Sequence, residues 1–178
     1  MKKSVKTQLD WLNRELGLLF RDLKKYSDND LNWKPGEGKW SVLQIMEHLI
    51  LAESLSQKYL EKKLSFDPEL KNANIISSMR SLFISFYMKT PIKAKAPAAV
   101  GEVLPEHSTF WELVKQWKQD REDLETYLNS LPPELFKKQV YKHPMGGRMS
   151  IGNMMTFHKD HFKRHRKQIY RILKNFKY

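Results

Sequence analysis

Apolar residues recur at intervals of three or four positions along four long segments of the chain. These segments cover about residues 5–26, 42–64, 110–131 and 151–176. Such spacing places apolar side chains on one face of an α-helix, and no segment shows the sustained alternation of a half-buried strand. The pattern therefore predicts an all-α protein with four long helices.

Capping residues mark the expected starts of three of these helices. Ser41 with Gln44, and Thr109 with Glu112, fit the capping box, in which two side chains reciprocally satisfy free backbone N–H groups. Ser150 is placed to cap the last helix in the same manner. We expect the helices to begin directly after these three hydroxyl residues.

The connection between the second and third long helices predicts one further element. A shorter helix is expected over residues 75–88, with its apolar residues on one side, namely Ile75, Met79, Leu82, Phe83 and Phe86. Residues 90–106 contain three prolines and are assigned no regular structure. A long crossover that carries an extra helix, together with short loops elsewhere, fits a four-helix bundle forming a single domain over residues 1–178.

The composition excludes several kinds of protein. The chain has 32 Lys and Arg against 20 Asp and Glu, a net charge of +12, and 40% hydrophobic residues, which argues against disorder. The absence of cysteine excludes a disulfide scaffold, a thiolate metal site and a cysteine nucleophile. The longest apolar run, residues 49–52, is far shorter than the ~20 residues that span a bilayer. No secretory leader is visible, so we expect a cytoplasmic protein.

The histidines suggest a metal site. His161 and His165 lie four residues apart in the last helix, so both rings project from one face and can share a first-row divalent ion. His158 belongs to the same stripe, which is otherwise largely apolar. His48 lies among apolar neighbours of the second long helix, and bundles build metal sites from facing helices. His48 is therefore either the third ligand or a core histidine satisfied by hydrogen bonds.

Other types of site lack their required residues. No carboxylate stands three positions before any of the four helical histidines, as a di-iron bundle requires. The chain also lacks a His-Glu-x-x-His string and a glycine-rich phosphate loop. What remains is a mononuclear site with three neutral nitrogen ligands and open positions. His107 and His143 fall in loops and are expected to be structural or surface groups.

Basic residues gather towards the C-terminal end, opposed within their own segment only by Asp160. They are Lys159, Lys163, Arg164, Arg166, Lys167, Arg171, Lys174 and Lys177. A nucleic-acid surface is one interpretation of this segment. We favour a solvated helix face that complements the helix dipole, because no nucleic-acid motif accompanies the charge. The same field would attract an anionic thiol cofactor or substrate.

Two stretches of the chain resemble the DinB-like superfamily. The first is the string GKWSVLQIMEHL at residues 38–49, followed by Ala52 and Glu53. The second begins with HPMG at residues 143–146, passes through Ser150 and ends with HFKRHRKQI at residues 161–169. The two stretches, in this order and spacing, place most of the chain within the resemblance.

The resemblance implies an up-down-down-up four-helix bundle that is often dimeric. It also implies one divalent ion, commonly zinc or nickel, held by three histidines that fall here on His48, His161 and His165. Relatives of this kind include transferases and isomerases that use bacillithiol, mycothiol or glutathione, and members without a known reaction. His158 is additional to the motif, and we interpret it as a residue that lines the pocket or carries a proton.

We therefore expect a metal-dependent transferase or hydrolase, with a homodimer as the assembly. Because the chain has no cysteine, a thiol nucleophile would come from a small molecule, or metal-bound water would act instead. Gln44 and Gln168 are each placed to orient a ligand histidine, or to serve as capping and surface groups. The alternatives are a non-catalytic binding bundle with a polar histidine core, and a nucleic-acid binder that uses the basic terminal helix.

Overall fold

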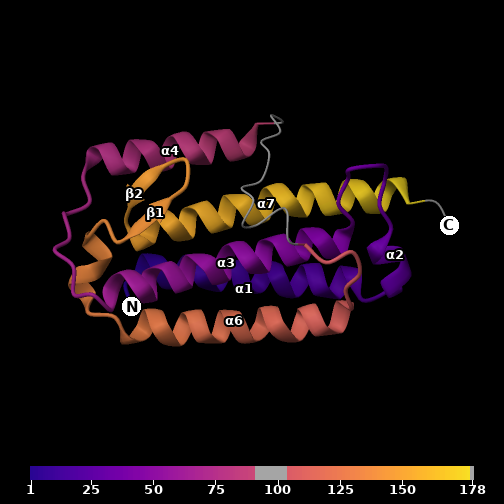
Figure 1. Ribbon diagram of the computed structural model, residues 1–178, viewed down its shortest axis with the longest axis horizontal. Coiled ribbons are helices and arrows are strands. Elements are labelled where there is room, and N and C mark those ends of the chain that lie inside the picture. The colour runs from indigo at the N-terminus through magenta and orange to yellow at the C-terminus, as the bar shows by residue number, and fades with distance from the viewer. Residues whose placement is uncertain (91–103, 177–178) are drawn as a thin grey trace.

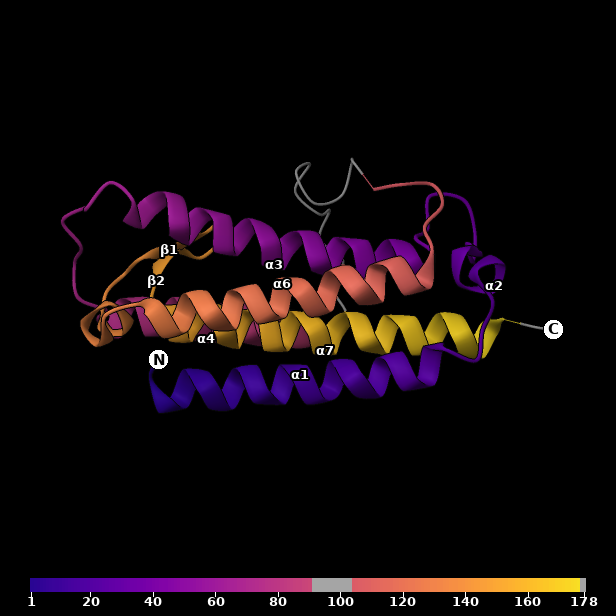
Figure 2. The same ribbon diagram turned by 90° about the horizontal axis from the view of Figure 1, so that it is seen from below.

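The computed structural model describes residues 1–90 and 104–176, and its regular structure is almost entirely helical. Four long helices lie side by side (Figures 1 and 2): α1 (Lys3–Leu23), α3 (Val42–Leu64), α6 (Phe110–Ser130) and α7 (Ile151–Asn175). The shorter helices are α2 (Asp28–Asn32), α4 (Ile75–Lys89) and the 3₁₀ helix η1 (Pro133–Lys137). The predicted all-α class is confirmed.

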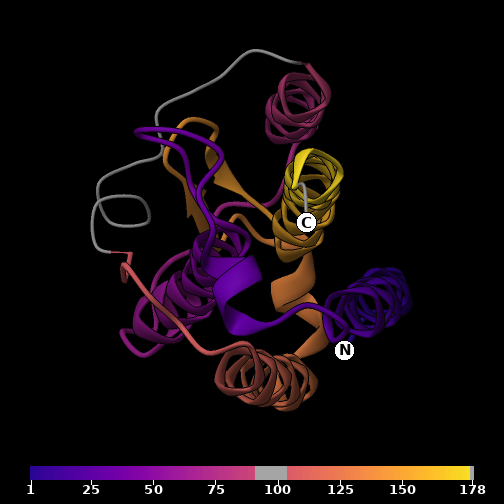
Figure 3. The same cartoon turned by 90° about the vertical axis from the view of Figure 1, so that its right-hand side faces the viewer.

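The apolar faces of the four long helices meet in a common core. Its largest fully buried side chains include Trp117, Phe162 and Leu9. Helix α7 lies between α4 on one side and α1 and α3 on the other, and contacts all three (Figure 3). The helix that carries three of the predicted site histidines thus packs against three other helices.

The predicted helix starts are correct, but one of the predicted caps is wrong. Ser41 and Gln44 form the expected capping box at the start of α3, and the Ser150 side chain accepts from the backbone N–H of Asn153. Thr109 makes no side-chain cap for α6. Instead, Asp28 Oδ1 accepts the Phe110 N–H at 2.8 Å, because α2 brings this carboxylate to the end of α6.

The connections between the long helices contain the predicted helix and a small sheet that the sequence pattern did not indicate. Helix α4 forms as expected, but its apolar side faces outward. Strands β1 (Tyr141–His143) and β2 (Gly147–Met149) form an antiparallel hairpin just before α7. Strands of three residues are too short to show an alternating pattern. The stretch assigned no regular structure lies mostly outside the described residues, which omit 91–103.

Membrane-spanning helices are not found in the described ranges, since none of the helices there is both long and apolar enough to cross a bilayer.

Candidate metal centre

Three histidines from two helices converge inside the bundle. His48 comes from α3, and His161 and His165 come from α7; one ring nitrogen of each lies within 4.8 Å of those of the other two. The Nε2 atoms of His48 and His161 are 3.0 Å apart. Around a tetrahedral ion with Zn–N bonds of 2.0–2.1 Å, ligand nitrogens stand about 3.3 Å apart, so only small adjustments are needed.

The local folding explains why these rings meet. The capping box at Ser41 fixes the start of α3, and His48 follows two turns later on the face that packs against α7. His161 and His165 occupy successive turns of α7, with ring centroids 4.6 Å apart, on the face turned towards α3. All three side chains are buried, with at most 9% of their surface exposed. The structure brings together all three sequence-predicted ligands.

Gln168 fixes the orientation of one ring. Its Oε1 atom lies 3.0 Å from His165 Nδ1. Because a carbonyl oxygen only accepts hydrogen bonds, His165 Nδ1 carries the proton and Nε2 keeps its lone pair for the centre of the cluster. Of the two roles expected for the glutamines, Gln168 makes a contact with a candidate ligand histidine, whereas Gln44 caps α3 and donates to the Pro105 carbonyl at 3.0 Å.

Aromatic rings enclose the cluster. The Trp40 ring lies 4.9 Å from that of His48 and is stacked at 6.5 Å on that of His165. Phe157 is stacked on His161 with centroids 5.1 Å apart. These rings remove water from the sides of the cluster, which strengthens any electrostatic interaction within it.

Burial keeps His158, His161 and His165 in their neutral form. It lowers the pKa of His165 to about 3 and the pKa of His158 to about 4. Burial, reinforced by the neighbouring His165 and His48, lowers the pKa of His161 well below its usual value. Neutral imidazoles are the form that binds metal, so no proton has to be displaced near neutral pH. The His161 Nδ1 atom is buried without a hydrogen-bond partner in the described ranges. Three buried imidazole donors, from His48, His161 and His165, fit a borderline divalent ion such as Zn²⁺ or Ni²⁺.

A buried ion pair lies beyond His48 along α3, and the sequence interpretation did not single it out. Arg121 of α6 donates to both carboxylate oxygens of Glu53, at 2.5 and 2.7 Å, and Trp117 Nε1 donates to the same group at 3.1 Å. Burial would raise the pKa of Glu53, but Arg121 outweighs it and holds the pKa below its usual range. The sequence signal that could have revealed this pair is Glu53 itself, an acidic residue on the buried face of α3. The Glu53 carboxylate also acts electrostatically on His158.

The two loop histidines differ from each other. His143 is buried in β1, and its Nδ1 atom accepts the N–H groups of Met145 and Gly146 at 3.1 and 3.0 Å, which closes the hairpin turn. His143 is therefore a structural group, which is one of the two roles expected for the loop histidines. His107 is exposed. Neither belongs to the cluster formed by His48, His161 and His165.

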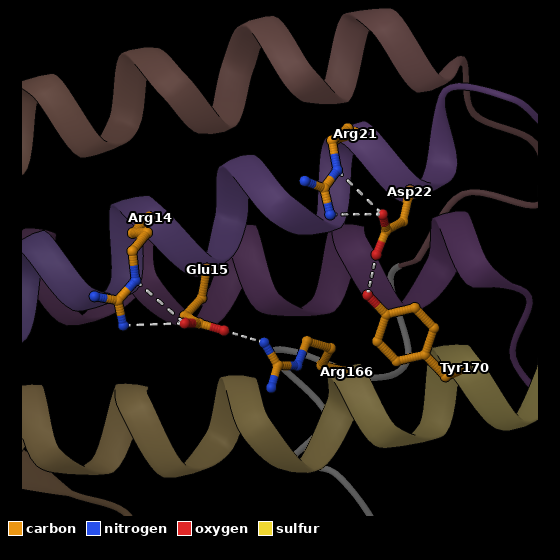
Figure 4. Close-up of polar contacts among 6 residues, drawn as sticks. All are labelled: Arg14, Glu15, Arg21, Asp22, Arg166 and Tyr170. Carbon is orange, nitrogen blue, oxygen red and sulfur yellow. Dashed lines mark hydrogen bonds and ion pairs between the residues drawn. The ribbon is translucent and has the colours of Figure 1, made fainter.

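Acidic residues of α1 oppose the basic side of α7, which the sequence alone could not indicate. Figure 4 shows contacts of Arg166 with Glu15 and of Tyr170 with Asp22, where the hydroxyl donates at 2.7 Å. Lys159 and Lys163 lie over the Trp11 ring at 5.3 and 4.9 Å. Much of this basic surface therefore contacts other side chains of the bundle. These contacts favour a solvated helix face, rather than a nucleic-acid surface, as the interpretation of the basic segment.

The buried histidines predict a loss of stability in acid. Above a pH of about 6.5 these rings are neutral both in the folded and in the unfolded chain. As the pH falls from there towards about 4, the unfolded chain binds protons that folded His143 and His158 do not bind. Each of these two rings therefore lowers the free energy of unfolding by about 1.4 kcal/mol per pH unit. Denaturant unfolding at a series of pH values measures this slope. His158→Gln should reduce it by one ring's share, and an unchanged slope would contradict the assignment.

Comparisons with known proteins agree with the geometry. The family profile described as the DinB superfamily matches residues 8–169. The chain is also 26% identical over 153 residues to the uncharacterized protein YuaE of Bacillus subtilis strain 168, a match that covers 86% of this chain and 89% of that protein. No solved structure matches the chain significantly. Since the family profile spans nearly the whole chain, this protein belongs to the DinB superfamily.

Proposed function

We propose that His48, His161 and His165 hold one divalent ion, zinc or nickel, in a thiol-dependent transferase or a hydrolase. The observation that carries this proposal is the convergence of three buried imidazoles from two helices. Three protein ligands leave positions for a further group, as in catalytic rather than structural metal sites. For the four long helices we propose the up-down-down-up order, which the course of the ribbon in Figure 1 supports.

A bound ion would act as a Lewis acid that lowers the pKa of a thiol or of water at its open position. The chain's own residues have separate tasks. Gln168 holds the ring of His165 in the metal-binding tautomer, and Trp40 and Phe157 exclude water from the sides. His158 is proposed to hold or pass a proton, since its buried Nδ1 atom has no hydrogen-bond partner in the described ranges. The substrate is a small molecule, and the reaction takes place in the cytoplasm.

Cobalt(II) provides a direct test of this function. The protein is loaded with cobalt(II) and titrated with glutathione and with bacillithiol as probes. We expect a sulfur-to-cobalt charge-transfer band, because the thiol sulfur would occupy the open position. His48→Ala should lose this band. Cobalt binding that depends on His48 but shows no band with either thiol would contradict the thiol-dependent reaction and leave the metal centre in place.

Gln168→Ala tests the positioning role of that amide. Without the acceptor, the His165 ring loses the hydrogen bond that fixes its tautomer and its rotation. Loss of such an outer partner costs about 10- to 100-fold in metal affinity. Isothermal titration with zinc measures the change, and Gln168→Glu, which keeps an acceptor oxygen, should restore binding. Equal affinities for the parent and both variants would show that the contact is incidental.

A further inference from the structure

Helix α4 exposes an apolar stripe that the packing of the bundle does not use. The helix lies on the outer side of α7, away from α1 and α6 (Figures 1 and 3). The stripe consists of six side chains, each between 57% and 78% exposed: Ile75, Ile76, Met79, Leu82, Phe83 and Phe86. Together they present on the order of 700 Å², above the roughly 300–600 Å² of the largest apolar patch on a typical monomer. A surface of this size marks a site of interaction.

Polar contacts hold the other side of α4 on the bundle. Its buried residues include Ser77, Ser81 and Ser85. Ser85 Oγ donates to the buried Asp160 carboxylate of α7 at 2.5 Å, and Asn153 Nδ2 donates to the Ser77 carbonyl at 3.4 Å. Because these contacts fix α4 through its polar side, its apolar side is turned away from the core. Packing within one copy of the chain therefore does not explain the stripe.

The hairpin that precedes α7 continues the stripe, and its strand β2 packs against α4. Met145, at the turn between β1 and β2, is 66% exposed and borders a small hollow that Phe83 and Tyr87 of α4 also line. The hairpin also carries two exposed cations, Lys142 and Arg148, which lie directly opposite each other in the two strands. Like charges in such a pair are unfavourable on their own, and an anionic partner would relieve their repulsion.

The α4 helix and the hairpin carry positive charge that no carboxylate neutralises. Residues 70–90 contain three cations and residues 135–159 contain five, and neither range contains an Asp or a Glu. Among the described residues, ion pairs join cations elsewhere in the fold, such as Arg166 with Glu15, and none involves α4 or the hairpin. This positive charge therefore remains for a partner outside the chain.

An anionic lipid surface matches both the apolar stripe and the charge beside it. A helix on a membrane surface buries its apolar side at the boundary between head groups and acyl chains, and cations near it attract anionic head groups. By helical spacing, Arg80 lies on one edge of the stripe and Lys89 on the other, so their long side chains extend towards the head groups when the stripe is buried. Nucleic acid would engage the cations but leave the stripe in water. A second copy would cover the stripe but bring the cations of both copies together.

We propose that the α4 stripe and the hairpin tip dock the protein on a bilayer with anionic head groups. The six α4 side chains and Met145 enter the boundary between head groups and acyl chains, while Arg80, Lys89 and Arg148 lie among the head groups. Helix α4 then lies parallel to the membrane plane. The histidine cluster faces α3 on the other side of α7, so the proposal goes beyond the metal function and is tested apart from it.

Cosedimentation of the full chain with vesicles tests the charge requirement. Vesicles of equal amounts of phosphatidylcholine and phosphatidylglycerol are compared with vesicles of phosphatidylcholine alone. We expect the chain to bind the mixed vesicles, and added salt to weaken this binding by screening. A cation near an anionic surface contributes about fivefold in affinity, so Arg80→Gln combined with Lys89→Gln should weaken binding by about 25-fold. Lys115→Gln, on α6, is the matched control and should bind like the parent. A parent that does not bind the mixed vesicles would overturn the proposal.

Phe86→Gln tests the apolar contribution. Its side chain is 68% exposed, so the substitution leaves the fold and zinc binding unchanged. We expect affinity for the mixed vesicles to fall by about tenfold, because less apolar surface leaves water. Trp111→Gln is the matched control, since this aromatic residue is 61% exposed on α6, on the far side of the bundle (Figure 3).

Two outcomes of this comparison would overturn the proposal. Equal affinities of the parent and Phe86→Gln would show that the vesicles merely adsorb a basic protein and that the stripe stays in water. A parent that ignores vesicles but sediments as a dimer, which Phe86→Gln dissociates, would assign the stripe to a contact between copies.

A labelled cysteine shows which face enters the lipid. The natural chain has no cysteine, so a thiol-reactive nitrobenzoxadiazole dye attaches only where a thiol is introduced. On Leu82→Cys, within the stripe, the dye should emit at shorter wavelength when mixed vesicles are added, and nitroxide-labelled lipid should quench it. On Trp111→Cys the emission should stay unchanged. Equal responses of the two variants, or a response of Trp111→Cys alone, would assign the docking to another face and overturn the proposal.

Discussion

His161→Ala is expected to abolish the binding of a divalent ion. The three rings lie at similar distances from one another, with the His161 centroid 5.0 Å from that of His48 and 4.6 Å from that of His165. Removal of the His161 ring leaves only two of the three candidate ligands. The loss should exceed the 10- to 100-fold that removal of an outer partner costs, so we expect zinc and nickel affinity to fall by more than about a hundredfold.

Metal analysis of the purified protein and isothermal titration measure this loss. The parent should carry about one ion per chain, and His161→Ala should carry none after dialysis. His107→Ala is the matched control, since this histidine is exposed and stands outside the cluster. A parent that stays empty after supplementation with zinc and nickel would contradict the metal site. In that case the cluster would be a polar core network, and the protein a non-catalytic bundle.

Glu53→Ala is expected to destabilise the fold by about 3–5 kcal/mol, the usual cost of leaving one member of a buried ion pair without its partner. Arg121 and Glu53 are both about 95% buried, and the same carboxylate accepts from Trp117. The change would leave a buried guanidinium that keeps its hydrogen bond to Asn13 Oδ1 at 3.0 Å and its place over the Trp117 ring. Denaturant unfolding measures the free energy.

Two further variants show whether the loss arises from the unpaired charge. Glu53→Leu combined with Arg121→Met removes both charges and should recover much of the stability. Asp10→Ala breaks the exposed pair of Lys6 and Asp10 on α1 and should cost far less than Glu53→Ala, because water screens that pair. Equal losses for Glu53→Ala and Asp10→Ala would contradict the assigned role of the buried pair.

The inward faces of the histidines could be predicted because their signals are local, whereas the meeting of His48 with His161 and His165 was implied by the family resemblance. The four-residue spacing of His161 and His165 fixes their common face, and the apolar neighbours of His48 indicate that it points inward. The start of α3 followed from the Ser41 capping box for the same reason. Each of these inferences uses residues within one or two turns of one another.

The structural features that the sequence pattern could not predict depend on contacts between distant segments of the chain. Asp28 caps α6 across 82 residues, and Glu53 meets Arg121 across 68. The periodicity of α4 was correct, but a helical pattern does not tell which side faces the bundle, and here the serines face inward. The ion pair between Glu15 of α1 and Arg166 of α7 likewise cannot be predicted from the charges along one segment.

The late place of α7 in the sequence determines when the histidine cluster can be completed during synthesis. His48 and His161 are separated by 113 residues, and the helices that must enclose them pack on α7, the last helix of the described chain. At a rate of about 5–20 residues per second, the ribosome makes His161 roughly ten seconds after His48. Until then α3 exposes His48 without its companions. Any ion that the cluster holds must therefore be acquired after α7 has been synthesised.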